Sequence, residues 1–89
     1  MDYNKYTIKQ CDMPDDMKKF VLRTFNEGNE KFKNEKEICS YIKLALDKEY
    51  LPTWHCFIGR EFASHVTYDP GTYLHFLIGN HTILVFKCG

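Results

Sequence analysis

The sequence lacks a long uninterrupted hydrophobic run, so no segment of it predicts a helix that crosses a bilayer. It also lacks an excess of charge of one sign, because its 12 basic and 12 acidic residues give a formal net charge of +0. Proteins that bind nucleic acid or an anionic membrane surface normally carry a basic patch. We therefore expect a soluble protein whose partners include no nucleic acid and no membrane.

The spacings typical of metal sites are absent as well. The four cysteines are widely separated, at Cys11, Cys39, Cys56 and Cys88. No C-x₂-C or H-x₃₋₅-H pair of the kind that binds zinc occurs, so we expect neither a metal nor a cofactor. Residues 1–10 lack the apolar core of a signal peptide, and we therefore interpret the cysteines as reduced thiols of a cytoplasmic protein.

No catalytic group stands out from the sequence. Cys56 follows His55, but neighbouring residues of a strand point to opposite faces. Neither an orienting third group nor an oxyanion loop accompanies the pair, and a buried cysteine is usually a packing residue. We therefore expect that the protein is not an enzyme.

The sequence does contain many core-forming residues for its length. Of its 89 residues, 44% are hydrophobic and 16% are aromatic. A chain this short forms a single domain, residues 1–89, and buries a smaller share of its surface than a large domain does. Because a small core cannot hide so many apolar side chains, we expect the chain to form an oligomer.

The first half of the chain predicts a strand and two helices. Residues 6–11 alternate between polar and apolar side chains, which is typical of a strand. Pro14 and the acidic pair after it predict the start of the first helix, which Gly28 weakens by about 1 kcal/mol relative to Ala. Asn34 is a favourable N-cap for the second helix, which ends before Pro52.

The second half predicts four strands, at residues 54–59, 62–67, 72–78 and 81–87, joined by turns such as Gly79-Asn80. The first two strands predict a hairpin whose second strand offers an edge to another chain. The fold class is α+β, with two helices packed on an antiparallel sheet in the order β-α-α-β-β-β-β. The helices cover one face, and we expect the other apolar face to meet a second copy in a homodimer.

Several motifs together resemble the small cytoplasmic dynein light chains, the dimeric family whose members bind peptide segments of other proteins. The motifs are a DM pair, an EK pair, YxPTWHC, GRxF, VT and ILxFKxG, at Asp12-Met13, Glu35-Lys36, Tyr50 to Cys56, Gly59 to Phe62, Val66-Thr67 and Ile83 to Gly89. The resemblance extends over residues 1–89 as a single dynein light chain domain.

The resemblance implies a strand-swapped homodimer in which residues 62–67 extend the sheet of the partner subunit. The interface residues that it implies are Trp54, His55, Phe62, Ser64, Val66, Thr67 and Cys88. His55 would then lie at the dimer seam, where a positive charge would weaken the dimer. Without the resemblance, a lone histidine in an apolar strand is more often a buried core residue.

The resemblance also implies a groove beside the swapped strand, where an extended client segment adds as a further strand. A client Gln would reach the start of the second helix, whose first backbone N–H groups lack intrahelical partners. The implied peptide-binding residues are Lys9, Glu35, Lys36, Phe62, Ala63, Ser64, His65, Val66, Thr67, Tyr68, His75 and Leu77.

The implied partners are the dynein intermediate chain or other client proteins with Gln-containing linear motifs. The implied location is the cytoplasm, with the cytoskeleton-associated dynein complex. From the residues alone, Glu35 and Lys36 also fit a solvated helix start without any ligand.

Among the positions that depart from the family pattern are four of the implied groove, where the family usually has Gly at position 63 and Tyr at positions 65, 75 and 77. This chain has Ala63, His65, His75 and Leu77 there. Loss of three phenol groups and addition of a methyl group alter stacking, hydrogen bonding and space in the implied groove. Two hypotheses follow: a homodimeric adaptor that binds client segments, or a diverged light chain that dimerises as a structural motor subunit and has lost general client binding.

Overall fold

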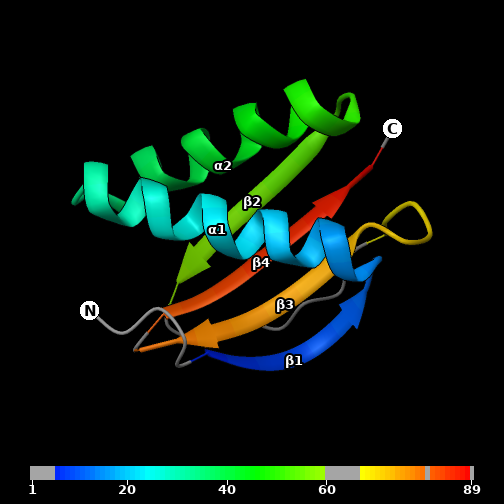
Figure 1. The fold of residues 1–89 in the computed structure, drawn as a ribbon, viewed down its shortest axis with the longest axis horizontal. Coiled ribbons are helices and arrows are strands. Elements are labelled where there is room, and N and C mark those ends of the chain that lie inside the picture. The colour runs from blue at the N-terminus through cyan, green and yellow to red at the C-terminus, as the bar shows by residue number, and fades with distance from the viewer. Residues whose placement is uncertain (1–5, 60–66, 80, 89) are drawn as a thin grey trace.

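Two helices lie on one face of an antiparallel sheet in the computed structural model, which describes residues 6–59, 67–79 and 81–88 (Figure 1). The elements are β1 (Tyr6–Asp12), α1 (Asp15–Lys31), α2 (Glu35–Tyr50), β2 (Trp54–Gly59), β3 (Tyr73–Ile78) and β4 (His81–Lys87). The sheet order is β1-β3-β4-β2, with every neighbouring pair antiparallel. The α+β prediction is confirmed. Of the strand expected at residues 62–67, positions 62–66 lie outside the described residues. The hairpin and the exchange of this strand between subunits therefore stay predictions.

Local signals in the sequence account for the helix bounds. α1 begins after Pro14, which is extended, with two acidic residues in its first turn, where they complement the helix dipole. At its other end, the backbone N–H of Phe32 donates to the carbonyl oxygen of Gly28 at 2.8 Å. α2 begins after Asn34, whose side-chain oxygen accepts a hydrogen bond from the backbone N–H of Lys36 at 2.7 Å. It ends at Tyr50, before Pro52, as expected.

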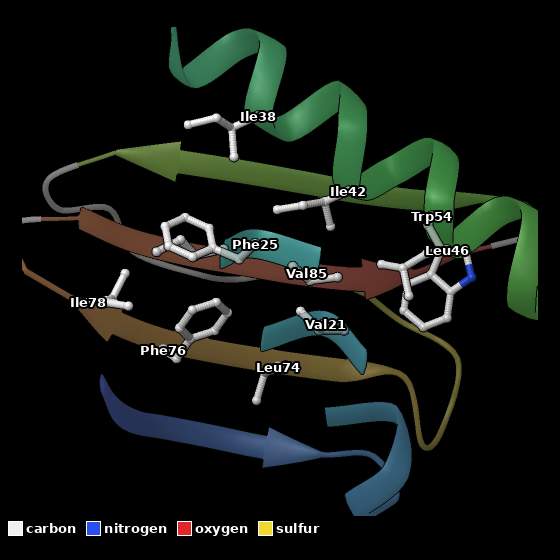
Figure 2. Close-up of a cluster of buried hydrophobic side chains, with 11 residues drawn as sticks. Val21, Phe25, Ile38, Ile42, Leu46, Trp54, Leu74, Phe76, Ile78 and Val85 are labelled. Carbon is white, nitrogen blue, oxygen red and sulfur yellow. The ribbon is translucent and has the colours of Figure 1, made fainter. Parts of the chain in front are cut away.

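The main core fills the space between the helices and one face of the sheet (Figure 2). α1 contributes Val21 and Phe25, and α2 contributes Ile38, Ile42 and Leu46 at helical spacing. The strands contribute alternate residues, as a sheet with one face toward the helices must. These strand residues are Trp54, Leu74, Phe76, Ile78, Ile83 and Val85, each no more than 6% exposed.

The second face of the sheet has its own apolar cluster, formed by Tyr73, Leu84 and Phe86. Tyr68 packs against this cluster, with its ring centroid 4.5 Å from that of Tyr73. Both described helices lie on the opposite face (Figure 1). The prediction that both faces carry apolar residues is confirmed, and Phe57 on β2 is 51% exposed.

Gly28 allows α1 and α2 to approach each other closely. It is buried, and a Cβ built on it would lie 3.1 Å from Cδ2 of Tyr41 and 3.5 Å from Cγ2 of Ile38. The first separation is tighter than ordinary van der Waals contact, so a larger residue would displace the Tyr41 ring. Gly28 therefore weakens the helix locally but serves the packing of the two helices.

Replacing Gly28 with Ala should stabilise the fold less than helix propensity alone would. Propensity favours Ala by about 1 kcal/mol, but its Cβ would crowd Tyr41. We expect Gly28→Ala to raise the free energy of unfolding by about 1 kcal/mol in a Tyr41→Ala background and by clearly less in the wild-type background. Urea unfolding of the four chains measures both values. Equal gains in the two backgrounds would show that the contact imposes no constraint.

Candidate functional site

The outer edge of β2 borders a groove next to α2. Within the described residues, β2 pairs only with β4, so its other edge has no described partner strand. A groove of about 480 Å³ lies there, and its lining residues come from the start of α2 and from β2: Glu35, Lys36, Cys39, Cys56, Phe57 and Ile58. Because neighbouring strand residues point to opposite faces, a groove that includes Cys56, Phe57 and Ile58 runs along the strand edge itself.

The start of α2 is fixed at this groove by polar contacts. Oε2 of Glu35 lies 2.8 Å from Nδ1 of His81, at the first residue of β4. The backbone carbonyl of Asn34 accepts hydrogen bonds from the N–H groups of Glu37 and Ile38, and its side chain accepts the one from Lys36. Asn34 thus satisfies three N–H groups at this end of the helix. These include the N–H of Lys36, at the helix start where the resemblance implies that a client Gln binds.

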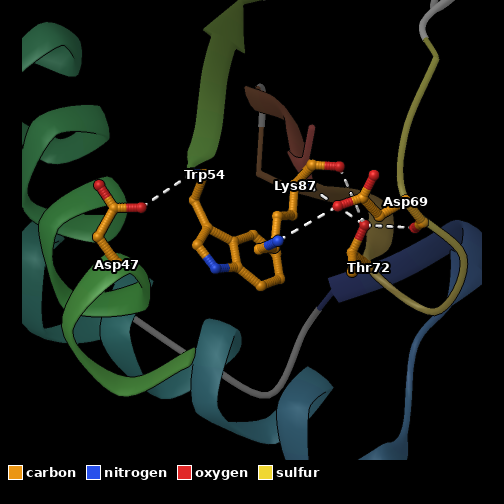
Figure 3. A network of polar contacts seen from close by, with 5 residues as sticks. All are labelled: Asp47, Trp54, Asp69, Thr72 and Lys87. Carbon is orange, nitrogen blue, oxygen red and sulfur yellow. Dashed lines mark hydrogen bonds and ion pairs between the residues drawn. The ribbon is translucent and has the colours of Figure 1, made fainter. Parts of the chain in front are cut away.

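The other end of α2 is held to the start of β2. Oδ1 of Asp47 accepts a hydrogen bond from the backbone N–H of Trp54 at 2.8 Å (Figure 3). Oδ2 of Asp47 lies 2.7 Å from Nζ of Lys43, and the hydrogen bond with Lys43 holds the pKa of Asp47 below its ordinary value. The side chain of Trp54 is fully buried in the main core. Trp54, which the resemblance places at the dimer interface, is thus a core residue within one chain.

Two of the implied peptide-binding residues, His75 and Leu77, lie away from the groove, on the second face of the sheet. His75 and Leu77 point to the face opposite the helices, because they alternate with the core residues of β3. β3 is separated from β2 by β4. The charge of Lys9 on β1 acts on His75, and burial together with that charge lowers the pKa of His75 from its ordinary value of 6.5. The structure therefore places Lys9 and His75 on neighbouring strands, β1 and β3, and it places Glu35 and Lys36 beside the groove at β2.

The turn before β3 is tied to the end of β4. The backbone N–H of Asp69 donates to the carbonyl oxygen of Lys87 at 2.8 Å, and Nζ of Lys87 lies 3.2 Å from Oδ2 of Asp69 (Figure 3). The hydroxyl of Thr72 donates to the carbonyl oxygen of Asp69 at 2.6 Å. Thr67 and Tyr68 come directly before Asp69 in the chain, so these contacts also fix their position. The side chain of Thr67 is exposed.

The remaining predicted residues fall into two groups. His55 is half-buried and packs against Phe86 with ring centroids 5.2 Å apart, whereas Cys88 is exposed and its N–H donates to the carbonyl oxygen of Thr53. The predicted residues outside the described part of the chain are Phe62, Ala63, Ser64, His65 and Val66.

Four groove residues are not among the binding residues that the sequence predicted: Cys39, Cys56, Phe57 and Ile58. His81, which contacts Glu35 beside the groove, had no predicted role either. The groove and this contact form between distant segments, for which no local sequence signal exists. In the described ranges there is no cluster of three or more metal-ligating side chains, and none of the helices there is long and apolar enough to cross a membrane.

The family of the chain follows from a comparison with known proteins. A model of the family described as dynein light chain type 1 matches residues 5–88. The chain belongs to this dynein light chain family. The match includes the whole edge of β2 and the start of α2, so the groove is part of the dynein light chain domain.

Solved structures have the same fold at low sequence identity. The dynein light chain-like domain of the Fasciola hepatica calcium binding protein FhCaBP2 is similar with a TM-score of 0.83 and 19% identity, over 100% of this chain and 98% of that chain. Its mercury derivative is similar with a TM-score of 0.81 and 19% identity, over 94% of this chain and 92% of that chain. The light chain-like domain of CsTAL3 is similar with a TM-score of 0.75 and 14% identity, over 92% and 90% of the two chains. At these identities the likeness shows the fold alone.

Acid should destabilise this light chain domain in part through His75. Because the pKa of His75 is lowered in the folded chain, the unfolded chain binds the proton more readily. The stability that neutral His75 contributes is therefore present above pH 6.5 and is lost as the pH falls below that value. We expect His75→Gln to lose less stability than wild type between about pH 7.5 and about pH 5.5.

Urea unfolding at one fixed chain concentration measures this difference. Acid effects at other groups cancel when the loss in the variant is subtracted from the loss in the wild type. Equal losses in the two chains would mean that the lowered pKa of His75 has no weight in folding.

Proposed function

We propose that the protein is a non-enzymatic homodimeric adaptor that binds extended segments of partner proteins by strand addition beside the exchanged strand 62–67, which itself pairs with the edge of β2 of the other subunit. The observation that carries this proposal is the groove along an edge with no described partner strand, in a chain of the dynein light chain family. Strand addition supplies main-chain hydrogen bonds for affinity, and side-chain pockets supply selectivity.

Dimerisation provides the strand on which the client segment adds. Residues 62–67 of one subunit extend the sheet of the other beyond β2, and the client segment lies along the exchanged strand, next to the start of α2. Phe57, which is 51% exposed on β2, would be covered by this exchange. Two grooves per dimer let it hold two client chains, so the second attachment depends on effective concentration. The cytoplasmic dynein complex, with its intermediate chain, is the proposed setting.

The start of α2 favours a client with a short amide or other acceptor side chain, because a helix N-terminus presents N–H donors and a positive dipole end. In this chain the side-chain oxygen of Asn34 already accepts a hydrogen bond from one of these donors, the N–H of Lys36. A client Gln must therefore displace the Asn34 side chain or bind beside it.

The occupied N–H of Lys36 is also the specific observation that favours the second candidate function. If Asn34 is not displaced, the chain dimerises as a structural motor subunit without general client binding. His75 and Leu77, in place of the usual tyrosines, support the same alternative.

The dimer can be tested by analytical ultracentrifugation at micromolar protein and neutral pH. We expect a dimer for the wild type and a monomer for His55→Lys, because a lysine at a two-fold seam would place two like charges in contact. Leu44→Lys is the matched control, since Leu44 is 65% exposed on α2 and the variant adds the same charge away from β2. A folded wild-type monomer, or a His55→Lys dimer as tight as the wild type, would contradict the proposed seam.

Replacing Asn34 should reveal whether the groove accepts a client glutamine. Asn34→Gly frees the N–H of Lys36 at a cost to the helix of only a few tenths of a kcal/mol, since Gly is itself tolerated as an N-cap. We expect isothermal calorimetry with a short Gln-containing peptide to give a Kd about fivefold to tenfold lower for Asn34→Gly than for wild type, as one gained hydrogen bond allows.

The control is the same peptide with Ala in place of Gln, which should bind both chains equally. A Gln peptide that binds neither chain, although both are dimeric, would reject the adaptor and leave the structural subunit. Equal binding of the Gln peptide by both chains would show that Asn34 does not compete for the site.

A further inference from the structure

Cys39 and Cys56 form a pair of thiols in the wall of the groove. Cys39 comes from α2 and Cys56 from β2, two elements that lie against each other, and both side chains line the same groove of about 480 Å³. The thiol of Cys56 hydrogen-bonds to the sulfur of Cys39. Both side chains are half-buried, neither is in a disulfide, and the groove connects them to solvent.

The two thiols differ in acidity because they share one hydrogen bond. Donation from Cys56 lowers the pKa of Cys39, whereas the same hydrogen bond and burial raise the pKa of Cys56 well above its ordinary value. The thiolate is the reactive form of cysteine. The pair therefore contains a more reactive thiol on α2 and a less reactive one directly beside it on β2.

We propose that Cys39 and Cys56 are a redox-modification site, at which hydrogen peroxide converts the two thiols into a disulfide that joins α2 to β2. The basis is the juxtaposition of two free thiols from two elements in one open groove. This site does not depend on client binding, although its place in the groove means that oxidation would change the surface a client meets.

The reaction balances in two steps. The thiolate of Cys39 attacks one oxygen of the peroxide, the O–O bond breaks, and Cys39 becomes a sulfenic acid while the other oxygen leaves as water after taking up a proton. The sulfur of Cys56 then attacks the sulfur of the sulfenic acid, its thiol proton joins the departing hydroxyl, and a second water leaves. Two thiols are oxidised to one disulfide, and one peroxide is reduced to two waters.

The other two cysteines make a suitable background for a test. Cys11 and Cys88 are both exposed and lie on the first strand and just after the last one. They do not line the groove. The double variant Cys11→Ser/Cys88→Ser keeps only the groove pair, so any disulfide within one chain must join Cys39 to Cys56.

The test exposes this double variant to a small excess of hydrogen peroxide and follows it by intact-mass spectrometry. We expect loss of both titratable thiols and a chain mass lower by two hydrogen atoms, reversed by dithiothreitol. Peptide mapping without reduction should recover the fragment of α2 joined to the fragment of β2. A chain that gains only oxygen atoms, or that links only to a second chain, would overturn the proposal.

Two further variants in the same background separate the roles of the thiols. Cys39→Ala should slow loss of the Cys56 thiol at least about tenfold, because partial burial still disfavours the thiolate of the remaining cysteine. Cys56→Ala should leave Cys39 as a sulfenic acid that dimedone traps. Equal oxidation rates of the two single-thiol chains would overturn the assigned order of attack, and circular dichroism confirms that each chain is folded.

Discussion

The attachment of α2 along β2 is the constraint on which the rest of the structure depends. Asp47 holds the N–H of Trp54 at one end of the helix, and Glu35 meets His81 at the other. Between these two ends of α2, Ile42 and Leu46 pack into the same core cluster as the ring of Trp54. Because α2 is fixed at both ends, its first turn borders the same groove as the edge of β2 that has no partner strand within the described residues.

Local features of the chain made most elements predictable. The acidic residues after Pro14 and the cap at Asn34 act on the nearest backbone groups, so the helix starts could be derived without knowledge of the fold. Apolar residues at both odd and even positions of β3 and β4 likewise indicated that both sheet faces are apolar. The order β1-β3-β4-β2 could not be derived in this way, since β2 pairs with the last strand and not with a neighbour in sequence.

Contacts between distant segments explain what sequence reasoning missed at the site. Nothing near Cys39 indicates that it will meet Cys56 across two elements, and nothing near His81 indicates that it will meet Glu35. For Gly28, one of its two effects could be predicted from the sequence and the other could not. Its helix-weakening effect was predictable, but its packing role depends on the ring of Tyr41, which only the fold brings within 3.1 Å of the missing Cβ.

The position of Trp54 gives the chain an internal optical probe. It is the only tryptophan, it is fully buried at the start of β2, and its ring centroid lies 6.3 Å from that of Tyr50 at the end of α2. Its fluorescence therefore reports on the contact between the end of α2 and the start of β2. Energy transfer from Tyr50 to Trp54 is efficient while the helix and the strand stay together. Separation of α2 from the sheet would be visible as a red-shifted emission without any attached label.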